Sequence, residues 1–510
     1  MKNRYWFVTV FFLLLITTPY LLANIQAGKD FVFIGFLVNP VDGNSYLAKM
    51  QEGYSGDWLF TLPFTNNPGD ATPLFLFYLC LGHIARILNS SLIWTFHITR
   101  LICSGLLLWT IYLYSKTIFP DQPKNCWRMY AFCLFCSGSG WIFLLLGKIP
   151  VDLWVAEAFP WMSMYTNPHF PLGMALLLLV LLFSRNVPSM KRDILLLGLS
   201  LLLAIVMPFG VVIVGLILTV NSLIKLIKLR NLEWRSLGAV FVGGGIPVFY
   251  QFWLAQSTPQ LAAWNKQNIT TSPGLIELFV SFSPLLILAS YAFWKERKNI
   301  FDENSLNVKI WLITGLVLVL IPFNLQRRFL FGLFIPVTCL STMGINFLVI
   351  QSRKLKKVIF PIVMGLSCLT VIMVVFIECY GIVNHSSDYY ITTDEDAALN
   401  WLRSNTESNA TILASPDMGN LIPGQINREV VYGHPFETPD AAAKLELVEN
   451  FFRGNMSSVQ MTDLIEKEKV QYVFYGPRET ELGDRMIDTS WGKIVFSQGN
   501  VTIFEVLNTK

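Results

Sequence analysis

Long apolar segments separated by short polar ones fill most of the first 380 residues of the chain. As α-helices, most of them are long enough to cross the hydrocarbon core of a bilayer, which is about 30 Å thick. The pattern therefore predicts an α-helical polytopic membrane protein with about 11 transmembrane helices. The predicted spans are 5–25, 92–114, 127–147, 169–184, 194–207, 208–226, 237–254, 274–294, 308–323, 328–350 and 358–380.

The segment from Ile194 to Ile224 contains no charged residue and, as a single helix, would be roughly 46 Å long. That length is well beyond the thickness of a bilayer core. Basic residues flank the segment on both sides, and Pro208 and Gly210 interrupt it near the middle. We therefore expect a hairpin of two short crossings.

Residues 381–510 differ in character, because charged and apolar residues mix there as they do in soluble proteins. The stretches ATILAS, VQYVFYG, KIVFSQ and VTIFEV are typical of strands, and TTDEDAALNWLRSN and TPDAAAKLELVENFFRG of helices. We expect two domains: a transmembrane bundle, residues 1–380, with a large first external loop at 26–91, and a small external α/β domain, residues 381–510.

Composition supports the membrane assignment, since 53% of the residues are hydrophobic, 14% are charged and the mean hydropathy is +0.51. The net charge of +4 is small, and Lys and Arg lie in short clusters between apolar segments, which argues against a nucleic-acid partner. By the positive-inside rule, these clusters predict a multi-pass protein of the cell membrane with a cytoplasmic N-terminus and an external C-terminal domain. The first segment is expected to be an uncleaved span; a signal peptide is the alternative.

The loop between the first two predicted spans is unusually long and polar. It contains NPVDGNSYLAKMQEGYSGDWL, residues 39–59, and ends in an amphipathic helix that carries His83 and Arg86. We expect that helix to lie at the membrane interface. The alternative, a span at 73–88, would invert every later loop against the positive-inside rule.

The stretch DGNSYLAKMQEGYSGDW, followed by TPLFLFYLCLGHIARI and a span that opens with HITRL, resembles the first external loop of C-type (GT-C) glycosyltransferases. It is similar in particular to the group of protein O-mannosyltransferases and lipid A aminoarabinose transferases. The resemblance implies a multi-span bundle and a sugar donor linked to polyprenyl phosphate. It also implies a catalytic or acceptor-activating role for Asp42 and a substrate-binding role for Tyr46. Gly43 departs from the pattern, because many members of the group have a second acid there.

The chemistry of glycosyl transfer supports the same role for Asp42, because the reaction needs a carboxylate. Such a group accepts the proton of an acceptor hydroxyl or stabilises positive charge at the anomeric carbon. At a membrane interface, partial desolvation would increase its basicity. The alternative is that Asp42 only caps a helix that begins near Ser45.

The second external loop carries Asp152, Glu157 and His169 among aromatic residues. C-type glycosyltransferases often place a second acid in this loop, for the acceptor or for a divalent cation. The resemblance therefore implies a catalytic role for Asp152 or Glu157, and it leaves Mg²⁺ or Mn²⁺ open as a cofactor. Either carboxylate alone is as readily explained as a solvated loop residue. His169 is a candidate substrate-binding residue, but it also fits a turn into a helix.

Arg327 and Arg328 are adjacent and lie on the predicted external side, against the positive-inside bias. A guanidinium group binds a phosphate through two hydrogen bonds, so either residue is a candidate for the donor phosphate. The resemblance implies the same role, since its members commonly use a basic residue in a late external loop. The alternative is that both side chains extend to lipid headgroups.

In the C-terminal domain, SPDMGNLIPGQINREVVYGHPFETPD predicts a long loop rich in Gly and Pro. His434 is the residue of this loop that we assign to substrate binding, and Asp417, Arg428 and Glu437 are further candidates for contact with an acceptor. The alternative is ordinary turn chemistry.

These features together predict a membrane glycosyltransferase, a hexosyl- or pentosyl-transferase that acts on the external face. It would transfer a sugar from polyprenyl phosphate to a lipid, glycan or protein acceptor. No Walker A, dinucleotide-binding or HExxH motif points elsewhere. One alternative is a transporter or flippase, although its ionisable residues would be expected at mid-membrane on broken helices. The other is a non-catalytic assembly protein of the cell envelope, in which Asp42→Asn would be harmless.

Overall fold

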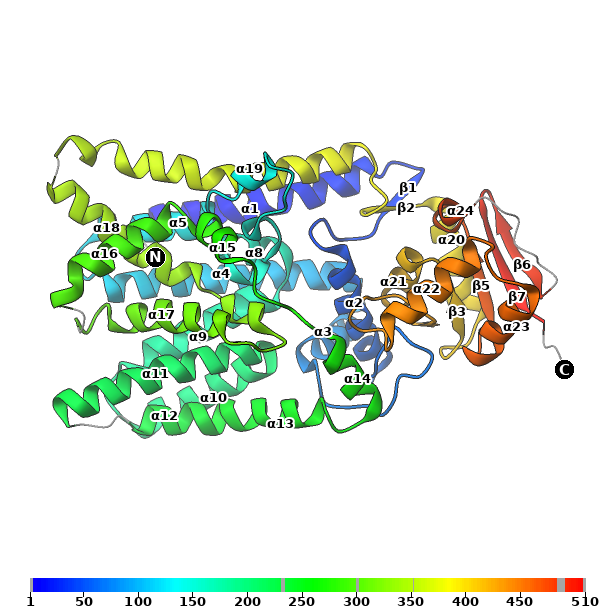
Figure 1. The fold of residues 1–510 in the computed structure, drawn as a ribbon, viewed down its shortest axis with the longest axis horizontal. Coiled ribbons are helices and arrows are strands. Elements are labelled where there is room, and N and C mark those ends of the chain that lie inside the picture. Colours follow the sequence, from blue (N-terminus) through cyan, green and yellow to red (C-terminus); the bar gives the residue numbers. More distant parts are fainter. Residues whose placement is uncertain (1–2, 231–233, 300–301, 352, 484–490, 508–510) are drawn as a thin grey trace. The chain divides into compact units, whose positions relative to one another are not determined.

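The computed structural model describes residues 3–230, 234–299, 302–351, 353–483 and 491–507. The chain divides into two units (Figure 1). Unit 1 comprises Met1–Pro19, His97–Tyr250 and Thr270–Tyr380, and unit 2 comprises Tyr20–Phe96, Gln251–Ile269 and Gly381–Lys510. Residues from Gly381 onward belong to unit 2 together with two earlier segments, and the division into domains 1–380 and 381–510 stays a prediction.

Helices dominate the apolar part of the chain, and those of unit 1 lie alongside one another (Figure 1). They are α1 (Asn3–Gln26), α4 (Leu92–Ile118), α5 (Pro123–Phe135), α9 (His169–Ser184), α10 (Met190–Val206), α11 (Pro208–Leu229), α12 (Trp234–Val240), α13 (Ile246–Leu254), α15 (Leu275–Phe282), α16 (Leu285–Lys295), α17 (Leu306–Leu320), α18 (Phe334–Gln351) and α19 (Ile359–Val383).

Six helices in the described ranges have the length and apolar composition of a membrane span, and α15 with α16, bent by 88°, would make a seventh. The six are Asn3–Gln26, Leu92–Ile118, Pro208–Lys228, Trp234–Leu254, Gln326–Gln351 and Ile359–Val383. Three shorter apolar helices are α3 (Leu76–Leu88), α9 and α17. The helical polytopic class is thus confirmed, while the number of about 11 spans stays a prediction.

Two of the predicted spans are interrupted. The span expected at 127–147 stops at the end of α5, and residues 136–140 lead into the short α6 (Trp141–Leu144). At Gly138 a Cβ atom would lie 1.9 Å from the Ser281 carbonyl oxygen, so only glycine fits there. The span expected at 274–294 bends before Pro284, which cannot donate a helical hydrogen bond. The predicted break near Pro208 is confirmed, because α10 and α11 meet at Met207.

The C-terminal residues of unit 2 form a five-stranded mixed sheet with the order β4-β3-β5-β7-β6. Its strands are β3 (Thr411–Leu413), β4 (Glu429–Val430), β5 (Tyr472–Tyr475), β6 (Gly492–Gln498) and β7 (Val501–Val506). Strand β3 pairs in parallel with β4 and β5, and β7 pairs antiparallel with β5 and β6. All four predicted strands are confirmed, and the two-residue β4 is additional.

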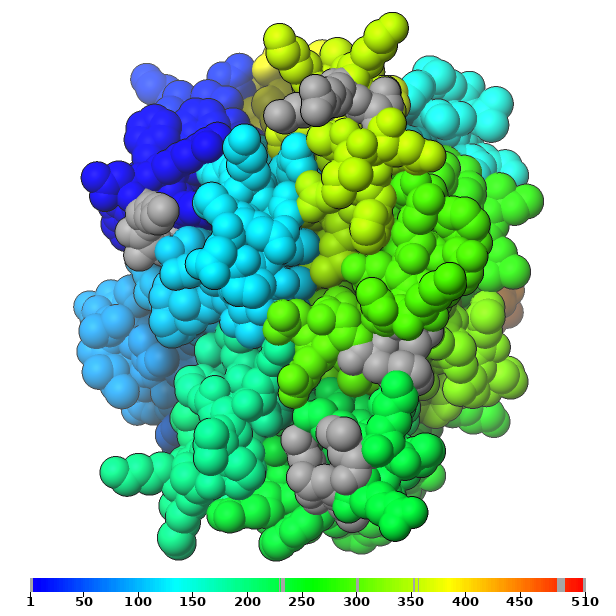
Figure 2. All heavy atoms as spheres, turned by 90° about the vertical axis from the view of Figure 1, so that its left-hand side faces the viewer, coloured from blue at the N-terminus to red at the C-terminus, as the bar shows by residue number. Residues whose placement is uncertain are grey.

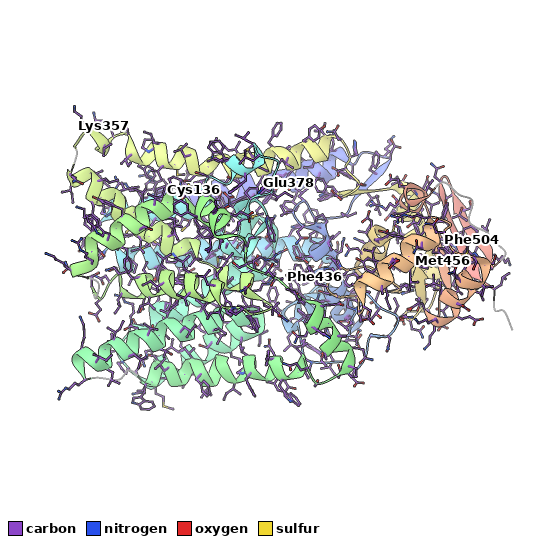
Figure 3. All side chains as sticks on the ribbon, in the orientation of Figure 1. Cys136, Lys357, Glu378, Phe436, Met456 and Phe504 are labelled. Atoms are coloured by element: carbon purple, nitrogen blue, oxygen red, sulfur yellow. The ribbon has the colours of Figure 1, made fainter. Side chains whose placement is uncertain are left out.

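Helices pack on both faces of this sheet. They are α20 (Thr393–Asn405), α21 (Pro416–Ile426), α22 (Ala441–Phe452), α23 (Ser458–Lys467) and α24 (Pro477–Leu482). Ile412 and Leu413 are neighbours on β3 but belong to different hydrophobic clusters, because side chains alternate across a strand. The cluster of Ile412 includes residues of α20 and α21; that of Leu413 includes residues of α22 and α23. Met456 and Phe504 pack against the second cluster (Figure 3).

The long first loop is built into unit 2 with the C-terminal residues. Strand β1 (Phe31–Phe33) pairs antiparallel with β2 (Tyr390–Thr392), and α2 (Pro40–Ser55) packs against α21. Helices α2 and α3 approach closely through two glycines: a Cβ on Gly53 would lie 2.1 Å from the Leu79 oxygen, and one on Gly82 would lie 2.0 Å from the Met50 oxygen. These contacts hold α2, which carries Asp42, against α3 and α21 within unit 2.

Candidate active site

A polar stripe runs along one face of α2. Asp42, Ser45, Lys49 and Glu52 follow one another at intervals of three or four residues, which places their side chains on the same side of a helix. Within unit 2, three of these four residues contact the segment 434–437 of the C-terminal part. The helical spacing is visible in the sequence, whereas the partner segment is not.

Asp42 lies in the first turn of α2, because the helix begins at Pro40 and not near Ser45. The alternative interpretation of Asp42 as the cap of a later helix is therefore wrong. Asn39 Nδ2 donates to Asp42 Oδ2 at 2.6 Å, and the positive end of the helix dipole stabilises the carboxylate. The Asp42 side chain is 33% exposed, so a substrate can reach it.

His434 is the other functional candidate in this place. Its side chain is buried, and Nε2 lies 3.4 Å from Asp42 Oδ1. The backbone N–H groups of Phe436 and Glu437 both donate to His434 Nδ1, at 3.1 Å each. Because Nδ1 accepts, the neutral ring carries its proton on Nε2, the atom that faces Asp42. The 3.4 Å separation is longer than an ordinary hydrogen bond, and catalytic hydrogen bonds commonly shorten when substrate binds.

Lys49 and Glu437 form a buried ion pair one turn further along α2. Lys49 is fully buried, and its Nζ donates to Glu437 Oε1 at 2.8 Å and to Oε2 at 3.0 Å. Ser45 Oγ also donates to Glu437 Oε1, at 2.7 Å. Burial by itself raises the pKa of the Glu437 carboxyl. The charges of Lys49 and His434 and the hydrogen bonds from Lys49 and Ser45 together outweigh that effect, so the pKa lies below its usual value.

Tyr46 and Gly43 lie on the apolar side of α2. The Tyr46 ring stacks on Tyr78 of α3, with centroids 4.5 Å apart. At Gly43 a Cβ atom would lie 2.4 Å from the ring of Phe36, a core residue. This close packing is the physical reason why the second acid of the resembling family has no room here.

Glu52 ends the stripe. Its Oε1 accepts hydrogen bonds from the Thr61 backbone N–H, at 3.0 Å, and from the Thr61 hydroxyl. Burial raises the pKa of the Glu52 carboxyl to about 7, although these hydrogen bonds and Lys49 lower it. The sequence pattern does not assign a role to Lys49 or Glu52, because both occur in a polar stretch that is typical of a solvated loop.

In unit 1, Asp152 occupies a buried turn. It lies on α7 (Val151–Trp154), and its Oδ2 accepts from Ser137 Oγ at 3.0 Å and from the backbone N–H groups of Gly138 and Gly140 at 3.1 and 3.3 Å. Burial raises the pKa of Asp152 against the lowering effect of these hydrogen bonds. The carboxyl holds together the interruption that follows α5, which favours a structural role.

Glu157 and the two arginines come together in unit 1. Glu157 Oε1 lies 3.4 Å from Arg327 Nε and 3.4 Å from Arg328 Nη1. The Arg327 guanidinium also lies 4.5 Å from the centre of the Trp154 ring. Glu157 is nearly buried, while the arginine side chains are partly exposed. These three side chains together carry a net charge of +1.

The remaining prediction in unit 1 concerns His169. It is the first residue of α9, it is nearly buried and its ring lies against Phe170, with centroids 4.0 Å apart. Unit 2 thus brings Asp42 and His434 together, and unit 1 brings Glu157, Arg327 and Arg328 together. Asp152 and His169 belong to neither of these two groups.

A divalent cation finds no ready set of ligands in the described parts of the chain. No three His, Cys, Asp or Glu side chains gather there. Asp42 and His434 supply only two donors, so Mg²⁺ or Mn²⁺ there would need water and substrate oxygens for its other ligands. We therefore derive no step through a metal ion.

Comparison with solved structures shows that the chain has the fold of the C-type membrane glycosyltransferases. Apo oligosaccharyltransferase from Archaeoglobus fulgidus matches with a TM-score of 0.54 and 13% identity, over 93% of this chain and 70% of that chain. ArnT from Cupriavidus metallidurans, bound to undecaprenyl phosphate, matches with a TM-score of 0.54 and 10% identity, over 100% of this chain and 99% of that chain. The sequence matches no protein-family model and no curated protein. The resemblance seen in the first loop is thus confirmed at the level of the fold.

Proposed function

We propose that the protein is a membrane glycosyltransferase that moves a sugar from a polyprenyl-phosphate donor to a lipid, glycan or protein acceptor on the external face. The observation that carries this proposal is the pairing of Asp42 with His434. A partly exposed carboxylate in a helix's first turn faces a buried imidazole whose tautomer is fixed by two backbone N–H groups. The fold supports glycosyl transfer as the class of reaction, and the pair offers Asp42 as the base.

The proposed reaction is a single displacement at the anomeric carbon. The acceptor hydroxyl forms the new C–O bond, the bond to the donor phosphate breaks, and polyprenyl phosphate leaves with the bonding electrons. Asp42 accepts the hydroxyl proton. His434 is the proposed positioning residue: its Nε2 lies 3.4 Å from Oδ1 and would donate to that oxygen when substrate binds, while Oδ2 accepts from Asn39.

Arg327 and Arg328 are the proposed partners of the donor phosphate. Their charges would stabilise the phosphate as it leaves, and Glu157, between the two guanidinium groups, would hold them in position. In this proposal Glu157, and not Asp152, is the acid of the second loop that serves the reaction. Tyr46 and His169 are kept as candidate substrate contacts.

The test uses the purified full-length chain in nanodiscs and a panel of polyprenyl-phosphate sugars. Release of polyprenyl phosphate is measured for the wild type, for Asp42→Asn and for Arg327→Ala with Arg328→Ala. We expect Asp42→Asn to lower the rate about 100-fold or more, and the double arginine variant to weaken donor binding as well.

Two matched controls separate chemistry from general damage. Asp57→Asn makes the same change at an exposed acid of the same loop, and Arg297→Ala with Lys298→Ala removes two adjacent exposed charges. Both should leave turnover within about twofold of the wild type. Turnover that survives Asp42→Asn would overturn the assignment of the base. Failure of every lipid-linked donor to bind would favour a transporter or an assembly protein.

A further inference from the structure

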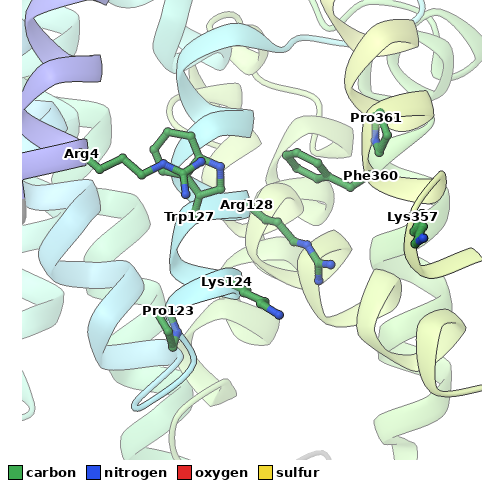
Figure 4. A pocket seen from close by; sticks show the side chains of 8 residues that line it. All are labelled: Arg4, Pro123, Lys124, Trp127, Arg128, Lys357, Phe360 and Pro361. Atoms are coloured by element: carbon green, nitrogen blue, oxygen red, sulfur yellow. The ribbon is translucent and has the colours of Figure 1, made fainter. Parts of the chain in front are cut away.

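A cavity of about 390 Å³ in unit 1 is lined by four basic side chains, and none of its lining residues belongs to the candidate active site. The basic residues are Arg4, Lys124, Arg128 and Lys357. Trp127 and Phe360 form aromatic walls of the same cavity (Figure 4). Among the described residues, no acidic side chain lines the cavity and none of the four basic side chains forms an ion pair.

The contacts of the two arginines orient their side chains without neutralising them. The Arg4 guanidinium lies 3.6 Å from the centre of the Trp127 ring (Figure 4). Arg128 Nη1 donates to Asn346 Oδ1 at 2.8 Å and to Asn125 Oδ1 at 3.3 Å. Amide oxygens carry no net charge, so the cavity keeps the positive charge of all four residues.

Three helices begin beside the cavity and add to its positive potential. Helix α1 begins at Asn3, α5 at Pro123 and α19 at Ile359. The free N–H groups of a helix's first turn carry a partial positive charge and favour an anion nearby. Four basic side chains and three helix starts therefore act in the same direction.

Apolar side chains are exposed on α1 and α19, a few residues after Arg4 and Lys357 in the sequence. Trp6 and Phe7 follow Arg4 on α1 and are 63% and 70% exposed, and Ile362 follows Lys357 on α19 and is 55% exposed. Figure 2 shows the end of unit 1 where the start of α1 (dark blue), the α5 region (light blue) and the segment before α19 (yellow-green) meet. The cavity thus offers positive charge, and the helices beside it offer exposed apolar side chains. A free phosphate ion would use only the first of these.

We propose that this cavity binds the phosphate headgroup of an anionic phospholipid. The three segments that line it are those that the positive-inside rule assigns to the cytoplasm, where the leaflet carries anionic lipids. The phosphate meets the basic side chains, and the acyl chains lie along the exposed apolar side chains of α1 and α19. This site is independent of the proposed transferase activity.

The test measures lipid binding to the full-length protein by native mass spectrometry, with phosphatidylglycerol, phosphatidylcholine and inorganic phosphate as separate probes. Lys124→Gln with Lys357→Gln removes two exposed charges from the cavity. Each nearby basic residue contributes roughly a fivefold factor to binding of an anionic lipid, so the double variant should bind phosphatidylglycerol about 30-fold more weakly. Phosphatidylcholine binding should not change.

The matched control is Lys298→Gln with Lys354→Gln, which removes two exposed charges from segments assigned to the same side but outside the cavity. It should bind phosphatidylglycerol like the wild type. Equal binding by the cavity variant and the wild type would overturn the proposal. Saturation by inorganic phosphate with no preference for phosphatidylglycerol would overturn the assignment to a lipid headgroup.

Discussion

At the scale of single residues, the proposed proton transfer depends on Asp42 as the base and on His434 as the residue that positions it. A carboxylate that accepts a proton must keep one oxygen directed at the acceptor, and an N–H donor on its other oxygen restricts its rotation. His434 is suited to this because its Nδ1 is occupied by two backbone donors and cannot exchange roles with Nε2. The Thr438 hydroxyl, which accepts from the backbone N–H of His434 at 3.1 Å, helps to hold that loop.

Substitution of His434 tests this positioning role. A hydrogen bond to a charged group is worth about 1.5–3 kcal/mol, so His434→Ala should lower kcat about 10- to 100-fold with a smaller change in KM. His434→Gln, whose amide N–H can replace Nε2–H, should recover a substantial part of that loss. Both variants are assayed for polyprenyl phosphate release from pH 5 to pH 9. Equal loss in the two variants would show that the residue serves only packing.

Glu52 allows a test of stability against pH. Its pKa is raised to about 7 in the folded protein, while the ordinary value of a glutamate is near 4.5. Between these values the unfolded chain has released the proton and the folded chain still holds it, so stability falls as pH rises. The limit of this effect is about 3 kcal/mol. Glu52→Gln, which keeps an acceptor for Thr61, should raise the thermal midpoint in detergent at pH 8 and change it little at pH 4.5. A lower midpoint at pH 8 would contradict the raised pKa.

At the scale of elements, α2 joins the first loop to the C-terminal residues, and the buried Lys49–Glu437 pair lies in that contact. Removing one partner of a buried pair leaves the other charge without compensation, which typically destabilises a protein by about 3–5 kcal/mol. Lys49→Met and Glu437→Gln should therefore each lower the thermal midpoint clearly. The double variant should lose less than the sum of the two, as a double-mutant cycle in detergent would show. Strict additivity would mean that the two charges do not interact.

The elements also show how far the sequence leads. Apolar segments and alternating patterns predict most of the helices and four of the five strands of the C-terminal sheet, because these patterns are local. Asp42, Arg327 and Arg328 could be singled out from their positions in the pattern. The contact of Asp42 with His434 could not be predicted from the sequence, because the two residues are far apart along the chain and no local pattern connects them. The same holds for Ser45 and Glu437 of this cluster, whose positions differ by 392. The buried turn of Asp152 could not be predicted either, because the glycines that bind its carboxylate lie in a segment whose apolar pattern predicts a continuous span.

At the scale of the whole molecule, unit 2 constrains the topology. Its three segments, 20–96, 251–269 and 381–510, form one unit, so the parts of them outside the membrane lie on the same side. The distribution of Lys and Arg predicts independently that these parts are all external. The two lines of reasoning agree, and together they predict that the candidate base and the C-terminal domain face the outside.

Cysteine labelling of intact cells tests this orientation. Asp417 is 77% exposed in the C-terminal domain, and Val187 is 83% exposed in a segment predicted to be cytoplasmic. A membrane-impermeant maleimide should label Asp417→Cys directly, and Val187→Cys only after the membrane is permeabilised. The wild type gives the background, because Cys80, Cys368 and Cys379 are partly exposed. Labelling of Val187→Cys but not of Asp417→Cys in intact cells would show that the orientation is the reverse of the predicted one. It would also place the proposed transfer reaction at the cytoplasmic face, where the lipid-linked donor would have to lie in the cytoplasmic leaflet.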